Sequence, residues 1–108
     1  MSKEVKNADL SSLAEIDRLV HEPVRLMVMS LLYVVDSVDF TFLMNQTDLT
    51  WGNLSGHVSK LEEAGYLEVE KTFKAKRPKT TLKLSSRGRK AFRDYANTMK
   101  HLFEDFND

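Results

Sequence analysis

Positive charge is concentrated in one segment of this chain, although the chain as a whole is neutral. The 108 residues contain 16 lysines and arginines against 16 aspartates and glutamates, yet the ten basic residues from Lys71 to Arg93 are interrupted by no acidic one. Such a block repels itself, and its simplest use is to bind a polyanion, above all the phosphates of a nucleic acid. A solvated hairpin and helix face is the plain alternative. A membrane surface fits less well, because the block lacks the broad apolar face of an interfacial helix.

The segment 50–64 carries a second pattern, which predicts a helix with one apolar face. Leu54, Val58 and Leu61 recur along one stripe and are expected to pack inward. The opposite face holds small and polar residues, which weaken a helix but let it lie close to the bases in a major groove. An ordinary surface helix is the alternative. The candidate nucleic-acid-binding residues here are Thr50, Trp51, Gly52, Asn53, Ser55, Gly56, Ser59 and Lys60.

Four of the side chains in this segment have more specific expected roles. Asn53 is suited to reading adenine, and Lys60 to contacting guanine or a phosphate. Trp51 either packs the start of the helix onto the core or lies against a sugar-phosphate edge, and we favour partial packing. His57 borders the apolar stripe, so we expect a hydrogen-bonded structural histidine rather than a base contact. A basic hairpin tip is expected to add phosphate or minor-groove contacts from Lys74, Lys76, Arg77 and Lys79.

The periodicity of the whole chain predicts the elements that position these residues. Two alternating stretches predict strands on either side of a basic turn at 75–79, with Phe73 on the buried side and Pro78 keeping the turn out of a central ladder. We expect one domain of the α+β class, mainly helical, a winged helix-turn-helix with N- and C-terminal dimerisation helices. Within residues 1–108 its elements are an N-terminal helix at 10–20, a core helix at 23–35, a helix-turn-helix at 41–64, a wing hairpin at 66–84 and a C-terminal helix at 86–106.

Residues at the ends of these segments predict where the helices begin. Thr41 and Thr50 are expected to cap the two short helices of the helix-turn-helix. Ser85 or Ser86 is expected to cap the last helix. Gly88 falls near the start of that helix, where we expect a glycine to be tolerable.

The terminal helices carry apolar stripes that predict a dimer. In the last helix, apolar residues step by three and four, as in a heptad repeat, and the distal half of this stripe has no evident partner within the chain. We expect it to meet the stripe of the first helix from a second copy; packing within one chain is the alternative. The candidate interface residues are Leu10, Leu13, Ile16, Val20, Tyr95, Met99, Leu102, Phe103 and Phe106.

The segment from Phe40 to Arg93 resembles a known family. It contains LTWGNLSGHVSKLEEAGYLEVEK followed by RPKTTLKLSSRGRKAF, and HEPVRLMVMSLL precedes it. Together these stretches resemble the small winged-helix transcriptional regulators of the MarR/ArsR type. The resemblance implies a homodimer on a pseudopalindromic operator, with 50–64 as recognition helix and 74–79 as wing. The chain departs from the family in having no cysteine for a thiolate metal site, and in a length that puts the MarR ligand pocket in question.

Other function classes find little support in the sequence. The chain has no cysteine, and its three histidines lie on separate predicted elements. Since catalysis and metal binding need convergent polar groups, we expect no enzyme, no metal and no cofactor. The sequence shows no apolar run of membrane-spanning length and no apolar core of a signal peptide, so we expect no membrane partner and a cytoplasmic location.

Charge, helix pattern and resemblance together predict a sequence-specific regulator of transcription that binds double-stranded DNA as a homodimer. A small-molecule effector is left open, because nothing in the sequence identifies one. The main alternative is a winged helix that serves as a protein-interaction subunit or adaptor without binding DNA. RNA or single-stranded DNA is a weaker alternative. Those ligands favour exposed aromatic residues for stacking, and only Trp51, Tyr66 and Phe73 are candidates near the basic region.

Overall fold

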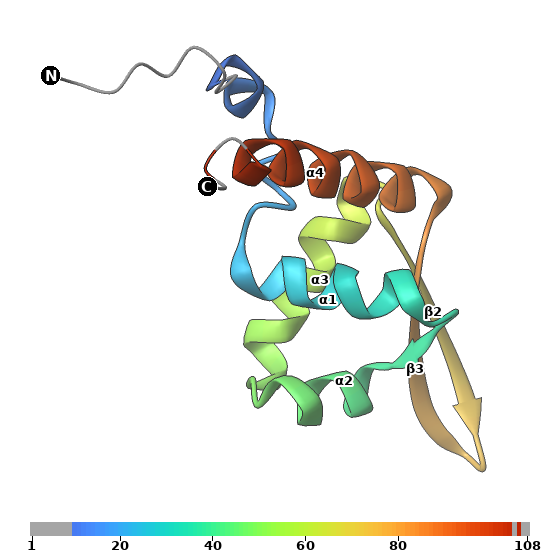
Figure 1. The fold of residues 1–108 in the computed structure, drawn as a ribbon. Coiled ribbons are helices and arrows are strands. Elements are labelled where there is room, and N and C mark those ends of the chain that lie inside the picture. The colour runs from blue at the N-terminus through green and yellow to red at the C-terminus, as the bar shows by residue number, and fades with distance from the viewer. Residues whose placement is uncertain (1–9, 105, 107–108) are drawn as a thin grey trace, which may run out of the picture.

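The chain folds into helices and a small sheet in the order expected for a winged helix-turn-helix (Figure 1). The computed structural model describes residues 10–104 and 106, without the side chains of residues 10–12. In chain order the elements are the 3-10 helix η1 (Leu10–Glu15), α1 (Pro23–Val34), β1 (Val38–Asp39), α2 (Phe40–Thr47), α3 (Trp51–Glu63), β2 (Leu67–Lys74), β3 (Arg77–Leu84) and α4 (Ser86–Glu104).

The N-terminal segment differs from the helix expected at 10–20. Its helical part is η1, which ends at Glu15. The carboxylate of Asp17 accepts hydrogen bonds from the backbone N–H groups of Leu19 at 2.9 Å and Val20 at 3.2 Å. These bonds offer the backbone an alternative to the helix, so the chain turns here and sends Val20 into the core.

The core lies between α1, α3 and the sheet. Helix α1 begins with Pro23 in its first turn, and the carboxylate of Glu22 accepts the N–H of Arg25 at 2.7 Å. Both features favour a helix start at this position. Buried side chains come from every element between α1 and α4. They are Val28, Met29, Leu32, Val38, Phe40, Leu43, Leu54, Val58, Leu61, Leu67, Leu82, Leu84 and Tyr95, together with Val20.

Helices α2 and α3 form the helix-turn-helix. Asp39 caps α2, because its carboxylate accepts the N–H groups of Thr41 and Phe42; the expectation that Thr41 is the cap was wrong. Asp48 adopts a left-handed conformation that ends α2. The hydroxyl of Thr50 then accepts the N–H of Asn53 at 3.1 Å, which confirms the expected cap of α3.

The sheet is antiparallel, with strand order β1-β3-β2. Ala75 and Lys76 have positive φ and connect β2 to β3 as a two-residue turn, which is tighter than the turn expected at 75–79. Pro78 therefore lies within β3, opposite Phe73. The ladder tolerates it because β1 pairs with β3 only farther along, so this part of β3 is an edge. The expectation that Pro78 lies in the turn was wrong, but the expectation that this segment stays out of a central ladder is confirmed.

Helix α4 begins after the hydroxyl of Ser85, which accepts the N–H of Gly88 at 2.9 Å. Figure 1 shows α4 crossing over the other helices at one end of the domain, while the β2–β3 hairpin extends away from them. None of the helices in the described ranges is long and apolar enough to cross a membrane.

Candidate nucleic-acid interface

The face of α3 that carries the candidate residues is open to solvent. Leu54, Val58 and Leu61 are buried as expected. Ser55 is half-buried, and the remaining candidates of this segment are exposed. These exposed residues are Thr50, Trp51, Gly52, Asn53, Gly56, Ser59 and Lys60.

Gly52 and Gly56 have no packing role within the described part of the chain. A Cβ built on either residue meets no atom within 4 Å. Glycine inside a helix costs about 0.5–1 kcal/mol relative to alanine. Alanine would therefore fit at both positions, and no contact in the described part of the chain explains either glycine.

Trp51 and His57 are held by contacts on the flanks of α3. The Trp51 ring lies 6.2 Å from the ring of Phe40, yet 65% of the residue is exposed. His57 is half-buried, and its Nδ1 lies 3.0 Å from Nη1 of Arg25 and 3.7 Å from the carboxylate of Glu22. With the imidazole neutral, Nδ1 accepts the Arg25 hydrogen bond. These contacts support partial packing of Trp51 and a structural role for His57.

Arg25 is a structural residue that the sequence reasoning missed. It is buried, and besides contacting His57 it donates from Nε to the carbonyl of Leu19 at 2.6 Å. It therefore ties α1 to the recognition helix α3 and to the turn before α1. A lone arginine within the apolar stretch of α1 was the signal that could have revealed it, because a buried charge requires partners.

A groove separates α3 from the hairpin. It has a volume of about 140 Å³, with Trp51, Ser55 and Ser59 on the α3 side and Lys71 and Thr80 on the hairpin side. Its remaining lining residues are Phe40, Val58, Glu62 and Val69. The exposed face of α3 and one face of the hairpin therefore form a continuous surface.

The candidate wing cations lie at and near the hairpin tip. Lys74 and Arg77 face each other next to the turn, Lys76 lies in it, and Lys79 is opposite Thr72. Lys74, Lys76 and Arg77 are exposed, and Lys79 is half-buried. Because side chains alternate along a strand, the cross-strand pair Lys74–Arg77 lies on the hairpin face opposite to that of Lys71. The wing therefore presents positive charge on both faces.

The basic residues between Lys71 and Arg93 are not all available to bind a polyanion, because residues in the second half of this run make contacts within the domain. Nη1 of Arg89 donates to the backbone carbonyl of Tyr33 at 3.1 Å, and the Arg89 guanidinium lies 4.8 Å from the centre of the Tyr33 ring. Lys90 pairs with Asp94 at 2.7 Å. The basic surface that remains for a polyanion is therefore centred on the wing.

Tyr66 links α3, α4 and the turn before α1. Its hydroxyl donates to the carboxylate of Asp17, and its carbonyl accepts the N–H of Ser85 at 3.0 Å. Burial, together with the hydrogen bond and charge of Asp17, raises the pKa of Tyr66 to about 12, although the charge of Arg87 acts in the opposite direction. Gly88 is required here, because a Cβ on it would lie 2.1 Å from the carbonyl oxygen of Tyr66. The sequence predicted only that a glycine is tolerable in this first turn and did not reveal the contact that requires it.

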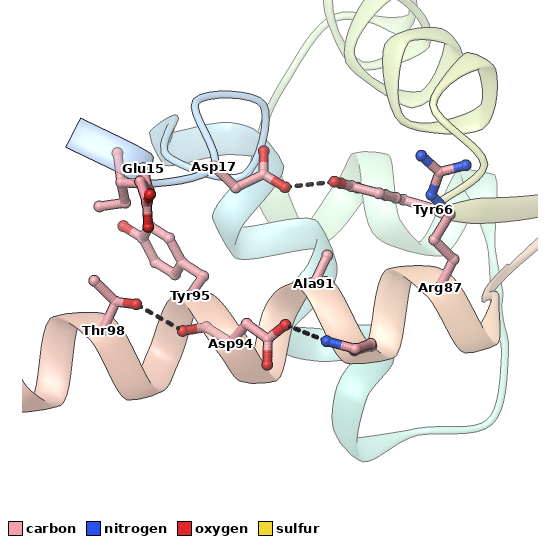
Figure 2. Close-up of a pocket in the computed structure, with 10 residues that line it drawn as sticks. Glu15, Asp17, Tyr66, Arg87, Ala91, Asp94, Tyr95 and Thr98 are labelled. Carbon is pink, nitrogen blue, oxygen red and sulfur yellow. Dashed lines mark hydrogen bonds and ion pairs between the residues drawn. The ribbon is translucent and has the colours of Figure 1, made fainter. Parts of the chain in front are cut away.

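A pocket of about 300 Å³ lies beside this junction, between η1 and α4 (Figure 2). Tyr66 and Tyr95 contribute aromatic rings to its wall. The charged lining residues have both signs: Glu15, Asp17 and Asp94 are acidic, and Arg87 and Lys90 are basic. Ile16, Ala91 and Thr98 complete the lining. The pocket is suited to a small polar molecule rather than a purely apolar one.

The candidate dimer residues divide between the core and the surface. Val20 and Tyr95 are buried within their own chain, and the hydroxyl of Tyr95 lies 2.7 Å from Nδ1 of His21, so neither offers a side chain to a partner. Phe103 and Phe106 are 61% and 62% exposed. The half-buried candidates are Leu13, Ile16, Met99 and Leu102. The side chain of Leu10 lies outside the described residues.

A helix-turn-helix with an open recognition face and a basic hairpin defines the winged-helix class of DNA-binding proteins. The chain belongs to the winged helix DNA-binding domain family, whose family model matches residues 24–103. The fold and the family are those of regulators of transcription and support a DNA-binding regulator.

Relatives in sequence and structure agree with this assignment. The chain is 37% identical to an uncharacterised protein of Methanocaldococcus jannaschii over 78 residues, 72% of this chain and 85% of the relative. A transcriptional regulator homologue from Pyrococcus horikoshii OT3 superposes with a TM-score of 0.85 at 27% identity, covering 91% of this chain and 99% of that one.

More distant solved structures share the fold alone. NadR in complex with 4-hydroxyphenylacetate has a TM-score of 0.64 at 20% identity, covering 98% of this chain and 84% of NadR. Regulators of the MarR and ArsR families superpose with TM-scores of 0.60 and 0.56. These neighbours have the fold that the resemblance seen in the sequence implies.

Proposed function

We propose that this protein is a homodimeric regulator of transcription that binds specific sequences of double-stranded DNA through α3 and the wing. The observation that carries the proposal is the exposed face of α3. Its two glycines, Gly52 and Gly56, have open space around them and adjoin a basic hairpin. A helix face of this kind can approach the floor of a major groove while the hairpin reaches neighbouring phosphates.

The wing and α3 have different proposed roles: the wing supplies affinity for DNA, and α3 supplies sequence specificity. Lys74, Lys76 and Arg77 are exposed and contact phosphates or the minor groove, which supplies affinity for any sequence. Asn53 and Lys60 lie on the exposed face of α3 and read base edges. The alternative, a protein-interaction module, does not account for a lysine-rich tip, because protein interfaces are depleted in lysine.

Paired substitutions test this division. Arg77→Ala should weaken binding to all duplexes alike and reduce the slope of log affinity against log salt by about one. Asn53→Ala should relax the base preference at one position, which is measured by selecting bound sequences from a random pool. If both variants select the same sequences as the wild type and keep its salt slope, α3 and the wing are not the DNA-binding surface.

The distal part of α4 and Phe106, which follows this helix in the chain, supply the proposed dimer contact. Phe103 and Phe106 are exposed, with Met99 and Leu102 half-buried beside them, and exposed apolar patches of this kind mark protein interfaces. Two-fold symmetry would place two recognition helices about 34 Å apart, one turn of DNA. These residues follow the pocket-lining part of α4, so the dimer helix and the domain core are one continuous element.

A double substitution tests the dimer. Leu102→Ala with Phe106→Ala should halve the mass measured by light scattering, because it removes apolar surface from the interface and none from the core. Circular dichroism must show that the helices persist. An unchanged mass with intact helices would contradict the assignment of this surface to a dimer.

The pocket between η1 and α4 is the proposed site of a small-molecule effector. It contacts both α4, which leads to the dimer surface, and Tyr66, which follows α3 directly. NadR, which shares the fold, was solved with 4-hydroxyphenylacetate, so this acid is a suitable first probe. A rise in the unfolding temperature that Arg87→Ala abolishes would support the site, and a rise that the variant leaves unchanged would contradict it.

A further inference from the structure

Phe73 is an apolar side chain that the domain leaves uncovered. It is 77% exposed, although the alternation of β2 predicts that it shares the face of the buried Leu67. The reason is that the hairpin extends beyond the core, so the inward face of its outer half meets no other element among the described residues. Leaving a phenylalanine in water forfeits about 1.5–3 kcal/mol of burial. Phe73 is therefore free to contribute this free energy when a binding partner covers it.

Phe73 is paired with a second apolar residue at the same level of the hairpin. Pro78 lies directly opposite it across the ladder and is also exposed. Residues opposite each other in an antiparallel ladder share one face. The two side chains therefore form a small apolar cap on one face of the wing, next to its two-residue turn.

This cap faces the side on which α3 lies. Lys71 and Thr80, the next pair inward on the same face, line the groove between the hairpin and α3. The apolar cap therefore continues the surface that carries Trp51, Ser55 and Ser59. A ligand long enough to span α3 and the wing can therefore reach Phe73.

The charge around the cap specifies the occupant. From Lys71 onward the hairpin carries only basic charges. Lys71 lies on the same face as the apolar pair, Lys74 and Arg77 lie next to the pair on the opposite face, and Lys76 lies in the turn. A single aromatic ring amid lysines suits a polyanion that also offers apolar stacked surfaces. Double-stranded DNA has both, because its phosphates flank a groove whose floor is made of stacked bases.

We propose that Phe73, supported by Pro78, is a wedge that enters the minor groove of DNA and partly unstacks one base step, bending the duplex. Phenylalanine and proline are among the residues that minor-groove proteins insert in this way. The bend favours pyrimidine–purine steps such as TA, which unstack most easily. The wing then contributes to sequence preference through deformability of DNA. The inference rests on the proposed function, that is, on DNA binding by α3 and the wing.

The experiment measures DNA bending directly. Duplexes of about 30 base pairs carry a donor and an acceptor fluorophore at their ends, with either a TA or a GC step at the centre. The proteins are the wild type, Phe73→Ala, Phe73→Leu and the control Val34→Ala. Val34 is also 77% exposed but lies at the end of α1, so the control removes equally exposed apolar surface elsewhere. Thermal unfolding checks that each variant is folded.

We expect the wild type and Val34→Ala to raise energy transfer, more strongly on the TA duplex, and Phe73→Leu to retain part of the effect. Phe73→Ala should bind roughly tenfold more weakly and leave the DNA straight at saturation. If Phe73→Ala bends DNA like the wild type, or if the wild type binds without bending, the wedge is wrong and DNA binding stands. If the wild type binds neither duplex, the proposed function fails, and the wedge fails with it.

Discussion

The junction between α3 and α4 and the exposed face of α3 use glycine for opposite reasons. At the junction, Gly88 lies against the carbonyl of Tyr66 so closely that a Cβ has no room, and Gly65 has a φ of 79°. On the exposed face, Gly52 and Gly56 have no neighbour within 4 Å of a Cβ among the described residues. The first pair is explained by the fold, and the second pair is not.

The same contrast extends to the charged and aromatic residues around each pair. Around the junction, Asp17, Arg89 and Lys90 have partners within the chain. Beyond the exposed face of α3, Phe73 and the cations of the wing tip lie in solvent. The two glycines, Phe73 and the tip cations have no such contacts in the described chain and lie on one α3–wing surface, which supports the proposal that this surface binds a partner.

The largest effect that tests this comparison is expected from Gly88→Ala. The added methyl group overlaps the backbone of Tyr66, with the carbonyl oxygen at 2.1 Å and the carbonyl carbon at 2.8 Å, so α4 must shift away. We expect a loss of about 3 kcal/mol in the free energy of unfolding, measured by urea denaturation. A loss well below 1 kcal/mol would show that the junction is not tightly fitted.

The matched change on the exposed face should have the opposite sign. Gly52→Ala with Gly56→Ala should raise the free energy of unfolding by about 1 kcal/mol per site, because alanine favours a helix and meets no clash here. The same double variant should bind duplex DNA more weakly, since its methyl groups hold α3 away from the bases. Stabilisation without loss of DNA affinity would remove the functional explanation of these glycines.

A smaller effect concerns the ionisation of Tyr66. Its pKa is raised from 10.0 to about 12 by burial and by Asp17, so the folded protein resists loss of the phenolic proton. Below pH 10 the phenol is protonated in both states and its contribution to stability is complete. As the pH rises from 10 towards 12 the unfolded state ionises first, and this contribution is lost.

Tyr66→Phe provides the control for this pH dependence. The variant cannot ionise at this position, so its stability should fall less between pH 10 and 12 than that of the wild type. Urea denaturation across this range measures the difference. Identical slopes would show that the Tyr66–Asp17 contact does not stabilise the junction.

The sequence predicted the parts of the fold that follow from local periodicity. The inward stripe of α3, the cap at Thr50 and the two strands of the wing were all expected, because apolar spacing and capping residues determine them locally. Sequence reasoning failed where a contact with a residue far away in the chain determines the structure. No local sequence pattern shows that the carbonyl of Tyr66 lies against Gly88. Nor does any local pattern show that the hairpin extends beyond the core and leaves Phe73 exposed.

The N-terminal segment and the dimer candidates show the same limit. The apolar spacing of residues 10–20 is helical, but the Asp17 carboxylate competes for backbone N–H groups and ends the helix early. Val20 and Tyr95 fit an apolar stripe equally well as core or interface residues, and only the tertiary structure places them in the core. Exposure, rather than periodicity, distinguishes Phe103 and Phe106 from them.

The most direct test of the α3–wing surface is a fluorescence-anisotropy titration of the wild-type protein against labelled random-sequence duplex DNA, from about 50 to 200 mM salt. The account predicts binding at low salt that weakens steeply as salt rises, because lysines and arginines of the wing displace counterions from phosphates. Absence of binding at about 50 mM salt by the folded protein would contradict the account and favour a protein-interaction module.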